Sequence, residues 1–477
     1  MIPLRLSRIA QIVDGTIEFA SNSGTAGEGR QAQDVLIDGP VVTDSRAAQP
    51  GSLYVARVGE HADGHLYAGA ARDMGAVAML GTRAVDELPT IVVPDVQEAF
   101  ATLAHHVVGE VPGLNIIGIT GSSGKTSTKD MLGQVLAADG PTVAPEGSFN
   151  SEVGVPLTAC RVDLSTRHLV VEMGASGVGH IAYLTRITPP RIGIVLNVGH
   201  AHVGAFGSVE AIADTKAALV QALPADGVAV LNHDDALVSA MAQRTRARVV
   251  TVGCGEGADY RAVDIELDDV GRATFTVVTA STSSTVSLPV HGVHQVGNAL
   301  AVLAAAVESG VELPDAIRSL GQARAIARWR MEVRLLAGGI TSINDAYNAN
   351  PESMAAALVA LAQMGGPDRS RRTVAVLGAM RELGSAGDAA HRGVGMRAGV
   401  EGVDLVIAVG TEAAPIADGA EKSGVSTLRV GDVDEAFELL TQQLRDGDVV
   451  LFKSSRDSGL RYLGDRIVEH FKVEGAT

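Results

Sequence analysis

The chain has 477 residues and a formal net charge of −17, from 38 basic and 55 acidic residues. An acidic chain without a basic cluster is disfavoured as a partner of nucleic acid or of an anionic membrane surface, so we expect neither. Its two cysteines, Cys160 and Cys254, lie far apart, which excludes a zinc ribbon or a disulfide framework and suits a reducing compartment.

The N-terminal residues and the hydropathy of the chain both bear on where the protein is located. The first 15 residues contain Arg5 and Arg8 but no uninterrupted apolar core, which argues against a signal peptide. No charge-free apolar run reaches the roughly 18 residues that a membrane-spanning helix needs. We therefore predict a soluble, cytoplasmic protein, and its length suggests about three domains.

The first part of the chain extends to about Pro112 and reads as a small α/β domain. Residues 21–29 are polar and rich in Gly and Ser, which is typical of a surface loop. Short apolar runs at residues 52–55 and 76–80 predict strands.

The second part opens with the most informative motif of the chain. An apolar run at residues 114–119 predicts a buried strand, and a helical pattern at residues 127–138 follows a loop rich in Gly and Ser. Such a loop can bring backbone N–H groups and the N-terminus of a helix close to a phosphate. The sequence therefore predicts a phosphate-binding loop in which a lysine reaches the terminal phosphates and a threonine hydroxyl holds a magnesium ion, made of Gly121, Ser122, Ser123, Gly124, Lys125, Thr126 and Ser127.

This motif is shorter than the strict phosphate-loop pattern. In G-x-x-x-x-G-K-[ST] the first glycine would fall on Ile119, so only G-x-x-G-K-T remains. The shorter pattern arises by chance more often, and an ordinary Gly-rich turn between a strand and a helix stays an alternative.

Two further strands are predicted in the second part, each followed by polar residues. Residues 169–173 and 192–197 are almost wholly apolar, which favours a parallel sheet covered by helices. Because ligands bind at the carboxyl edge of such a sheet, Glu172 becomes a candidate magnesium ligand, although it could instead cap a helix. Lys216 lies in a helical pattern at residues 209–223, where a lysine is usually solvated.

The third part repeats the alternation of strands and helices. Apolar runs at residues 373–377, 405–409 and 449–452 predict strands, each followed by a helix-like stretch. This part is predicted to be a second doubly wound α/β unit.

Several motifs, taken in order along the chain, resemble those of the Mur ligases, the ATP-dependent amide ligases that build the peptide of the bacterial cell wall. Their order and spacing are far more specific than any one of them. They lie at residues 43–46, 63–65, 119–126, 150–156, 172–174, 201–208, 294–300, 330–332, 345–351 and 377–384.

The resemblance implies an α/β protein of three domains and a ligase activity. These are a small α/β N-terminal domain for a UDP-sugar (residues 1–112), a central ATPase domain with a P-loop-type parallel sheet (113–327), and a C-terminal Rossmann-like domain (328–477). The motifs at residues 345–351 and 377–384 imply ADP-forming addition of D-alanyl-D-alanine to UDP-MurNAc-tripeptide through an acyl phosphate. The expected protein is a monomer that uses ATP and two magnesium ions.

The resemblance also implies roles for individual residues. Lys216 would be carbamylated by CO2 and, with His202, would hold the second magnesium ion, while Thr126 and Glu172 hold the first. Asn298 would contact adenine, Arg330 the γ-phosphate, and Asp345 the ribose or the phosphates. The expected substrate residues are Ser45, Arg46, Asn150, Glu152, Tyr347, Asn348 and Asn350.

Other functions stay open at this point. One is another ligase of this superfamily, either the ligase that adds the third residue of the wall peptide or a folylpolyglutamate synthase. The first lacks support because no D-N-P-R-like segment is present, and the second because the N-terminal hundred residues resemble a sugar-nucleotide domain. A nucleotide-binding module that serves a protein partner is more remote.

Overall fold

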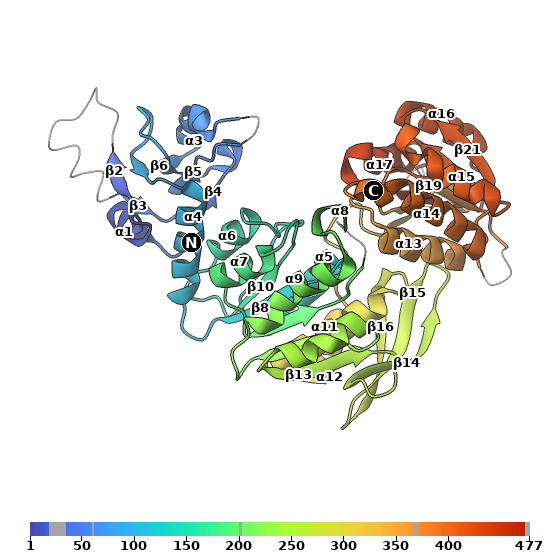
Figure 1. The fold of residues 1–477 in the computed structure, drawn as a ribbon, viewed down its shortest axis with the longest axis horizontal. Coiled ribbons are helices and arrows are strands. Elements are labelled where there is room, and N and C mark those ends of the chain that lie inside the picture. Colours follow the sequence, from blue (N-terminus) through green and yellow to red (C-terminus); the bar gives the residue numbers. More distant parts are fainter. Residues whose placement is uncertain (19–34, 60–61, 200–202, 367–369, 473–477) are drawn as a thin grey trace. The chain divides into compact units, whose positions relative to one another are not determined.

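The computed structural model describes residues 1–18, 35–59, 62–199, 203–366 and 370–472 (Figure 1). The chain folds into two compact units. The first comprises residues 1–118, 139–174 and 179–192, and the second comprises residues 119–138, 175–178 and 193–477. The predicted polar loop at residues 21–29 lies outside the described residues.

The N-terminal region of the first unit is built on a five-stranded sheet in the order β2-β7-β6-β5-β4. Strands β4 to β7 pair in parallel, and β2 pairs with β7 in the antiparallel sense. The two predicted strands are confirmed as β5 and β6. The strands are β2 (Thr16–Glu18), β4 (Val41–Val42), β5 (Ser52–Val55), β6 (Ala76–Gly81) and β7 (Thr90–Val92), with β1 (Leu4–Arg5) and β3 (Leu36–Ile37) forming a separate pair; the helices are α1 (Leu6–Ile12), α3 (Ala68–Asp73) and α4 (Val96–Gly109).

A nine-stranded sheet carries the predicted phosphate loop. Its order is β16-β15-β14-β13-β12-β11-β8-β10-β9, and the strands that were predicted from apolar runs are confirmed as β8, β10 and β11. Their bounds are β8 (Asn115–Thr120), β9 (Thr142–Val143), β10 (His168–Glu172), β11 (Ile192–Val195), β12 (Val228–Asn232), β13 (Arg248–Gly253), β14 (Tyr260–Leu267), β15 (Arg272–Val278) and β16 (Ser283–His291).

The other six strands of this sheet were not predicted, and the last three of them differ in kind from the predicted strands. Strands β14, β15 and β16 pair in the antiparallel sense, whereas β12, β13 and the start of β14 pair in parallel. Burial alternates along β15 and β16, so one face is packed and the other meets solvent. Alternating Thr or Ser with apolar residues is the sequence signal for such strands, and a search for wholly apolar runs misses it.

Helices flank the nine-stranded sheet, and α5 packs against α11 (Figure 1). Helix α11 is Ala-rich and buried on almost every side, as is typical of a helix in the interior. The helices are α5 (Lys125–Ala137), α6 (Gly154–Ala159), α7 (His180–Ile187), α8 (Val203–Phe206), α9 (Val209–Gln221), α10 (Ala236–Ser239), α11 (Gln295–Glu308) and α12 (Leu313–Leu320).

The C-terminal region has a six-stranded sheet in the order β17-β18-β22-β19-β20-β21. Five strands are parallel, and β17 is an antiparallel edge strand; the three predicted strands are confirmed as β19, β20 and β22. The strands are β17 (Glu332–Leu335), β18 (Thr341–Asn344), β19 (Thr373–Leu377), β20 (Leu405–Val409), β21 (Ser426–Val430) and β22 (Val449–Lys453), and the helices are α13 (Pro351–Met364), α14 (Gly387–Glu401), α15 (Ala414–Lys422), α16 (Val433–Gln443) and α17 (Leu460–His470).

Two apolar clusters in this region contain alternate residues of the same strands, such as Ala375 in one and Val374 in the other. Both faces of the sheet are therefore buried, as a doubly wound fold requires. Short 3-10 helices complete the structure: η1 (Ser45–Ala47), η2 (Gly64–Tyr67), η3 (Ala240–Arg244), η4 (Ala337–Gly339), η5 (Gly384–Ala386), η6 (Thr411–Ala413) and η7 (Arg456–Ser458).

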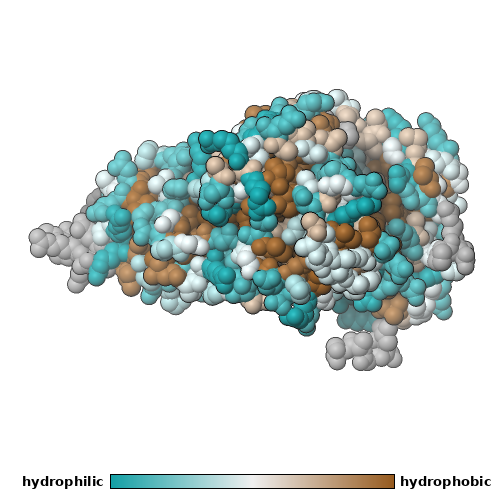
Figure 2. Space-filling model, turned by 90° about the horizontal axis from the view of Figure 1, so that it is seen from below, coloured by the Kyte–Doolittle hydropathy of each residue, from teal (hydrophilic) through white to brown (hydrophobic). Residues whose placement is uncertain are grey.

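On the face drawn in Figure 2, hydrophobic residues form separate patches among hydrophilic ones. Large apolar side chains with high exposure are spread over distant segments, as with Leu66, Val178, Leu335 and Val400. Within the described residues, no helix has the length and apolar character needed to cross a membrane.

Candidate functional site

The loop that the sequence predicted to bind phosphate, called the phosphate loop below, connects strand β8 to helix α5. Helix α5 begins at Lys125, and the residue before it, Gly124, has a φ of 80°, which side-chain-bearing residues rarely adopt. A Cβ at Gly124 would also lie 2.6 Å from Asn298 Oδ1. Glycine is therefore required here for two reasons: the backbone conformation is left-handed, and the Asn298 side chain lies where a Cβ would be.

Asn197, two residues after strand β11, holds the loop in shape. Its Oδ1 accepts a hydrogen bond from Ser123 N at 2.9 Å, and its Nδ2 donates to Ser123 O at 3.2 Å. Ser122 N donates to Asn197 O at 3.1 Å, and Ser122 Oγ accepts from Gly199 N at 2.8 Å. The sequence placed Asn197 at a strand end without giving it a role, and the structure assigns it the support of the phosphate loop.

The lysine and threonine of the motif lie in the first turn of α5. Lys125 Nζ donates to Gly121 O at 2.6 Å, so its side chain folds back over the loop. Thr126 is buried, and Ser127 lies beside it at half-buried exposure. A lysine over the loop with a hydroxyl at the next position is the arrangement that phosphate-binding loops use.

Asn298 lies in the first turn of α11 and is buried. Its Nδ2 donates to Gln295 Oε1 at 2.8 Å. This bond orients the Asn298 amide, and the amide lies close to Gly124 of the phosphate loop.

Lys216 is buried within helix α9, contrary to the solvated position that is usual for a helical lysine. Burial, followed by the positive charge of Lys125, lowers its pKa well below the ordinary value of 10.5. The environment therefore shifts Lys216 toward its neutral form, and the neutral form of an amine is the nucleophile.

Arg330, Tyr347 and Asp345 come together beyond the end of strand β18. The Arg330 guanidinium lies 4.4 Å from the centre of the Tyr347 ring. Asp345 Oδ1 accepts from Met331 N at 3.1 Å, and Asp345 Oδ2 accepts from the buried Lys453 Nζ at 2.6 Å. No sequence pattern indicates this ion pair, because its partners lie 108 residues apart.

The two asparagines of the same segment differ in exposure. Asn348 is exposed, and its main-chain O accepts from Lys453 Nζ at 3.1 Å. Asn350 is buried and caps helix α13 in a capping box with Ser353. Its Nδ2 also donates to Ser122 O in the phosphate loop, at 3.3 Å.

Glu172 and Asn150 are paired within the first unit. Glu172 ends strand β10, is fully buried, and its Oε1 accepts from Asn150 Nδ2 at 2.7 Å. The O atom of Glu152 accepts from Gln97 Nε2 at 2.6 Å, which ties this segment to helix α4. The bond from Asn150 orients the Glu172 carboxylate, and a buried carboxylate is stabilised by a paired cation or a metal ion.

Ser45 and Arg46 lie in η1 of the N-terminal region. Ser45 is buried, whereas the Arg46 side chain is exposed and forms a fork-shaped pair with Asp44, at 2.6 Å from Nη2 to Oδ2. This hydrogen-bonded guanidinium lowers the pKa of the Asp44 carboxyl to about 2. Sequence reasoning did not single out Asp44, although a carboxylate two residues from an arginine is a visible signal.

The remaining predicted ligand, His202, lies outside the described residues. In the part of the chain that the structure describes, no group of three His, Cys, Asp or Glu side chains could hold a metal ion.

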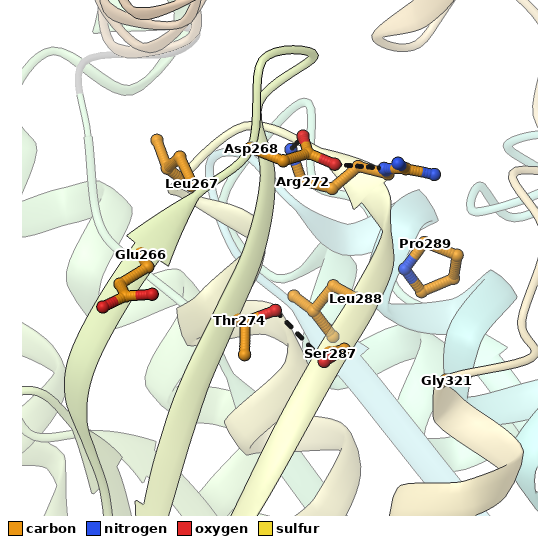
Figure 3. A pocket seen from close by; sticks show the side chains of 9 residues that line it. All are labelled: Glu266, Leu267, Asp268, Arg272, Thr274, Ser287, Leu288, Pro289 and Gly321. Atoms are coloured by element: carbon orange, nitrogen blue, oxygen red, sulfur yellow. Dashed lines mark hydrogen bonds and ion pairs between the residues drawn. The ribbon is translucent and has the colours of Figure 1, made fainter. Parts of the chain in front are cut away.

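Two hollows lie in the second unit. The first lies beside α5 and is lined in part by Ser127, Asp130, Gln295, Arg330 and Met331, which include two predicted site residues. The second, of about 460 Å³, lies against β14 to β16 and contains no predicted site residue (Figure 3). Figure 3 shows its polar contacts, between Asp268 and Arg272 and between Thr274 and Ser287.

The chain was compared with protein-family profiles and with known proteins. The profile of the Mur ligase middle domain matches residues 119–306, and that of the Mur ligase glutamate ligase domain matches residues 329–456. A UDP-N-acetylmuramoyl-tripeptide–D-alanyl-D-alanine ligase of Mycobacterium tuberculosis is 42% identical, with 98% of each chain covered. The enzyme of that name from Escherichia coli is 34% identical, with 86% of this chain and 87% of the relative covered.

Solved structures agree with this family. MurF from Acinetobacter baumannii has a TM-score of 0.86 at 30% identity, covering 98% of this chain and 99% of its own. MurF ligase from Thermotoga maritima in complex with ADP has a TM-score of 0.77 at 30% identity, and the match covers 91% of this chain and 97% of the Thermotoga maritima chain. The three-domain α/β fold expected from the sequence is therefore confirmed, and the chain belongs to the Mur ligase family.

Proposed function

We propose that this chain is the ATP-dependent, ADP-forming ligase that joins D-alanyl-D-alanine to UDP-N-acetylmuramoyl-tripeptide in peptidoglycan precursor synthesis. The observation that carries this proposal is the 42% identity to enzymes of that name over 98% of both chains. The similarity spans every region that would bind a substrate, and a relative at 30% identity was solved with ADP. The chain is accordingly an ATP-using ligase.

Each of the three expected domains would bind a different substrate. Residues 1–112 would bind the UDP-sugar, residues 113–327 would bind ATP, and residues 328–477 would bind D-alanyl-D-alanine and close over the nucleotide. A closed site would protect an acyl phosphate from water, which hydrolyses such intermediates readily.

The chemistry requires two steps. The terminal carboxylate of the tripeptide attacks the γ-phosphorus of ATP; a P–O bond forms, and ADP leaves. The amine of D-alanyl-D-alanine then attacks the acyl carbon, and the tetrahedral intermediate loses inorganic phosphate and a proton to give the amide. The first step brings two anions together, so local positive charge must offset their repulsion in a chain of net charge −17.

Lys125 and Arg330 would supply that charge. The backbone N–H groups of the loop and the N-terminus of α5 favour bound phosphate oxygens, and Lys125 already lies over this loop. Arg330 would bind the γ-phosphate as its charge redistributes in the transition state. Asn298 would contact adenine, and Asp345 would contact the ribose or the phosphates.

Two of the predicted ligands carry the oxygen donors that magnesium prefers. Thr126 offers a buried hydroxyl and Glu172 a buried carboxylate, and both donor types suit magnesium. When bound, two magnesium ions would neutralise phosphate and acyl oxygens. Thr126 and Glu172 would hold one ion, and His202 with a modified Lys216 would hold the other.

Lys216 would become a ligand as a carbamate. Its neutral amine would attack the carbon of CO2, forming an N–C bond as one C–O π bond opens and one proton is released, which converts the neutral amine into an anionic, carboxylate-like group. Its burial and its lowered pKa support this modification, because only the unprotonated amine reacts.

The substrates would be held by residues from the two ends of the chain. Ser45 and Arg46 would bind the UDP-sugar, and Asn150 and Glu152 would lie beside the tripeptide. Tyr347, Asn348 and Asn350 would face the incoming dipeptide or the nucleotide. The enzyme would act in the cytoplasm as a monomer, and cell shape and division would depend on its product.

Phosphate release tests this function directly. Purified protein with ATP and magnesium is incubated with UDP-MurNAc-tripeptide, with and without D-alanyl-D-alanine. We expect release only with both substrates, together with a pentapeptide product identified by mass. Release driven by UDP-MurNAc-dipeptide and one amino acid would move the chain to the preceding step, and release that ignores both would contradict a ligase.

A further inference from the structure

The second and third turns of helix α5 form hydrogen bonds with the segment that precedes Arg330. Asp130 and Gln134 lie four residues apart and therefore on one face of the helix. Gln134 Nε2 donates to Arg324 O, and Gln134 Oε1 accepts from Arg324 N, both at 2.9 Å. One side-chain amide thus satisfies both main-chain groups of a single residue.

Asp130 makes the next contact along the segment. Its Oδ2 accepts from Ala327 N at 3.1 Å, and its carboxylate is ion-paired with Lys129. Asp130 and Lys129 are both buried, so this contact lies in an environment that strengthens it. Residues 324–327 are therefore fixed to the helix that carries Lys125 and Thr126.

The backbone downstream of this attachment is strained around Arg330. Trp329 and Met331, on either side of it, have φ values of 59° and 49°, a region that side-chain-bearing residues rarely adopt. Trp329 O accepts from Tyr347 N at 3.2 Å, and Met331 N donates to Asp345 Oδ1 at 3.1 Å. A strained turn persists only where the chain is held on both sides, and α5 holds its upstream side.

We propose that Gln134, with Asp130, is a positioning residue that sets the place of the Arg330 guanidinium relative to the phosphate loop. This inference rests on the proposed role of Arg330 at the γ-phosphate. Lys125 and Arg330 would have to reach the same phosphate. Helix α5 carries Lys125 and is hydrogen-bonded to Arg324 and Ala327, shortly before Arg330 in the chain. Asp130, Arg330 and Met331 also line one hollow, which places the attachment next to the arginine.

Gln134→Leu tests the inference, because leucine keeps much of the volume and removes both bonds to Arg324. The turnover number should fall on the order of tenfold, with the KM for the dipeptide little changed, since only transition-state stabilisation is lost. The matched control is Gln363→Leu on α13, an exposed glutamine for which the structure gives no side-chain hydrogen bond among the described residues. This control should keep wild-type turnover.

A double-mutant cycle separates positioning from simple stability. If Gln134 acts through Arg330, Gln134→Leu should cost almost nothing further in the Arg330→Ala background. Losses that multiply in the double variant would overturn the inference, and so would unchanged turnover in Gln134→Leu.

Nucleotide affinity distinguishes failure of the inference from failure of the proposed function. We expect Gln134→Leu and Arg330→Ala to reduce, by similar factors, the preference for a non-hydrolysable ATP analogue over ADP in titration calorimetry. A wild-type protein without dipeptide-dependent phosphate release would contradict the function. An unchanged preference in Gln134→Leu, alongside a reduced one in Arg330→Ala, would contradict the positioning role.

Discussion

The Lys453 ammonium lies 2.6 Å from Asp345 Oδ2 and joins the end of strand β22 to the segment after β18. Lys453 also donates to Asp345 O at 3.3 Å and to Asn348 O at 3.1 Å, so all three of its donors are used. Asp345 in turn accepts from Met331 N. One buried lysine therefore organises the residues that were predicted to meet the nucleotide and the dipeptide.

Replacing Lys453 should destabilise the C-terminal region. Lys453→Met leaves a largely buried Asp345 carboxylate without its cation, and breaking such a pair costs about 3 kcal/mol or more of unfolding free energy. Chemical denaturation followed by the fluorescence of Trp329, the single tryptophan of the chain, measures this loss. Lys422→Met, at an exposed position on α15, is the control, and equal midpoints for the two variants would refute the prediction.

Lys216→Ala should abolish amide formation if Lys216 carries the carbamate. We expect a loss of at least about a hundredfold in turnover, because a charged metal ligand disappears. Short carboxylates such as acetate should restore part of the activity by filling the space of the carbamate. Phosphate release with and without added carboxylate is the measurement, and near-normal turnover in the alanine variant would exclude the assigned role.

Asn350 serves helix α13 and the phosphate loop with different atoms, so two variants separate these roles. Asn350→Ala removes the cap and should cost about 1 kcal/mol of stability. Asn350→Asp keeps the Oδ1 acceptor for Ser353 N, loses the bond from Nδ2 to Ser122 O, and places a negative charge beside the predicted phosphate loop. We expect the aspartate variant to keep its stability and to raise the KM for ATP. Equal stability of the two variants would argue against the capping role.

His168 should make stability depend on pH in the mildly acidic range. Burial lowers its pKa below 6.5, an effect only partly offset by Asp139, whose Oδ2 lies 2.8 Å from Nε2. The unfolded chain therefore binds the proton more readily than the folded chain does. The stabilising contribution is complete above pH 6.5 and is lost as the pH falls through the folded pKa.

The variant His168→Gln should flatten this part of the pH profile, because glutamine does not titrate. Unfolding free energies measured at several pH values between about 5 and 7.5 check the expectation. A profile as steep as that of the wild type would assign the pH dependence to other groups.

Much of the fold could be predicted because it is encoded locally. Strands β5, β19 and β20 end where the apolar runs end, since a strand buried on both faces must be apolar throughout. Strands β14 to β16 were missed because only alternate residues are buried, and that pattern is weaker. The β17 edge strand, Glu332–Leu335, is short and polar and has no clear signal.

In the candidate site, too, features encoded by neighbouring residues could be predicted, and contacts between distant residues could not. The predicted phosphate loop is contiguous, so glycine, lysine and threonine at fixed spacing were enough to predict it. Lys216 looked like a solvated helical residue, and only its resemblance to a family motif suggested otherwise before burial was known. Asp130 and Gln134 carried no visible signal, because their partners lie 190 or more residues away.

By itself, the sequence determined the α/β class and many strands of the parallel sheets, and it predicted the phosphate loop, because each depends on neighbours along the chain. The tertiary structure alone decided which side chains meet: Lys453 with Asp345, Asn197 with Ser123, and Gln134 with Arg324. The physical reason is that burial and hydrogen-bond geometry between distant segments arise only when the strands are ordered in a sheet. A residue's type limits what it can bind, and the fold determines what lies within reach.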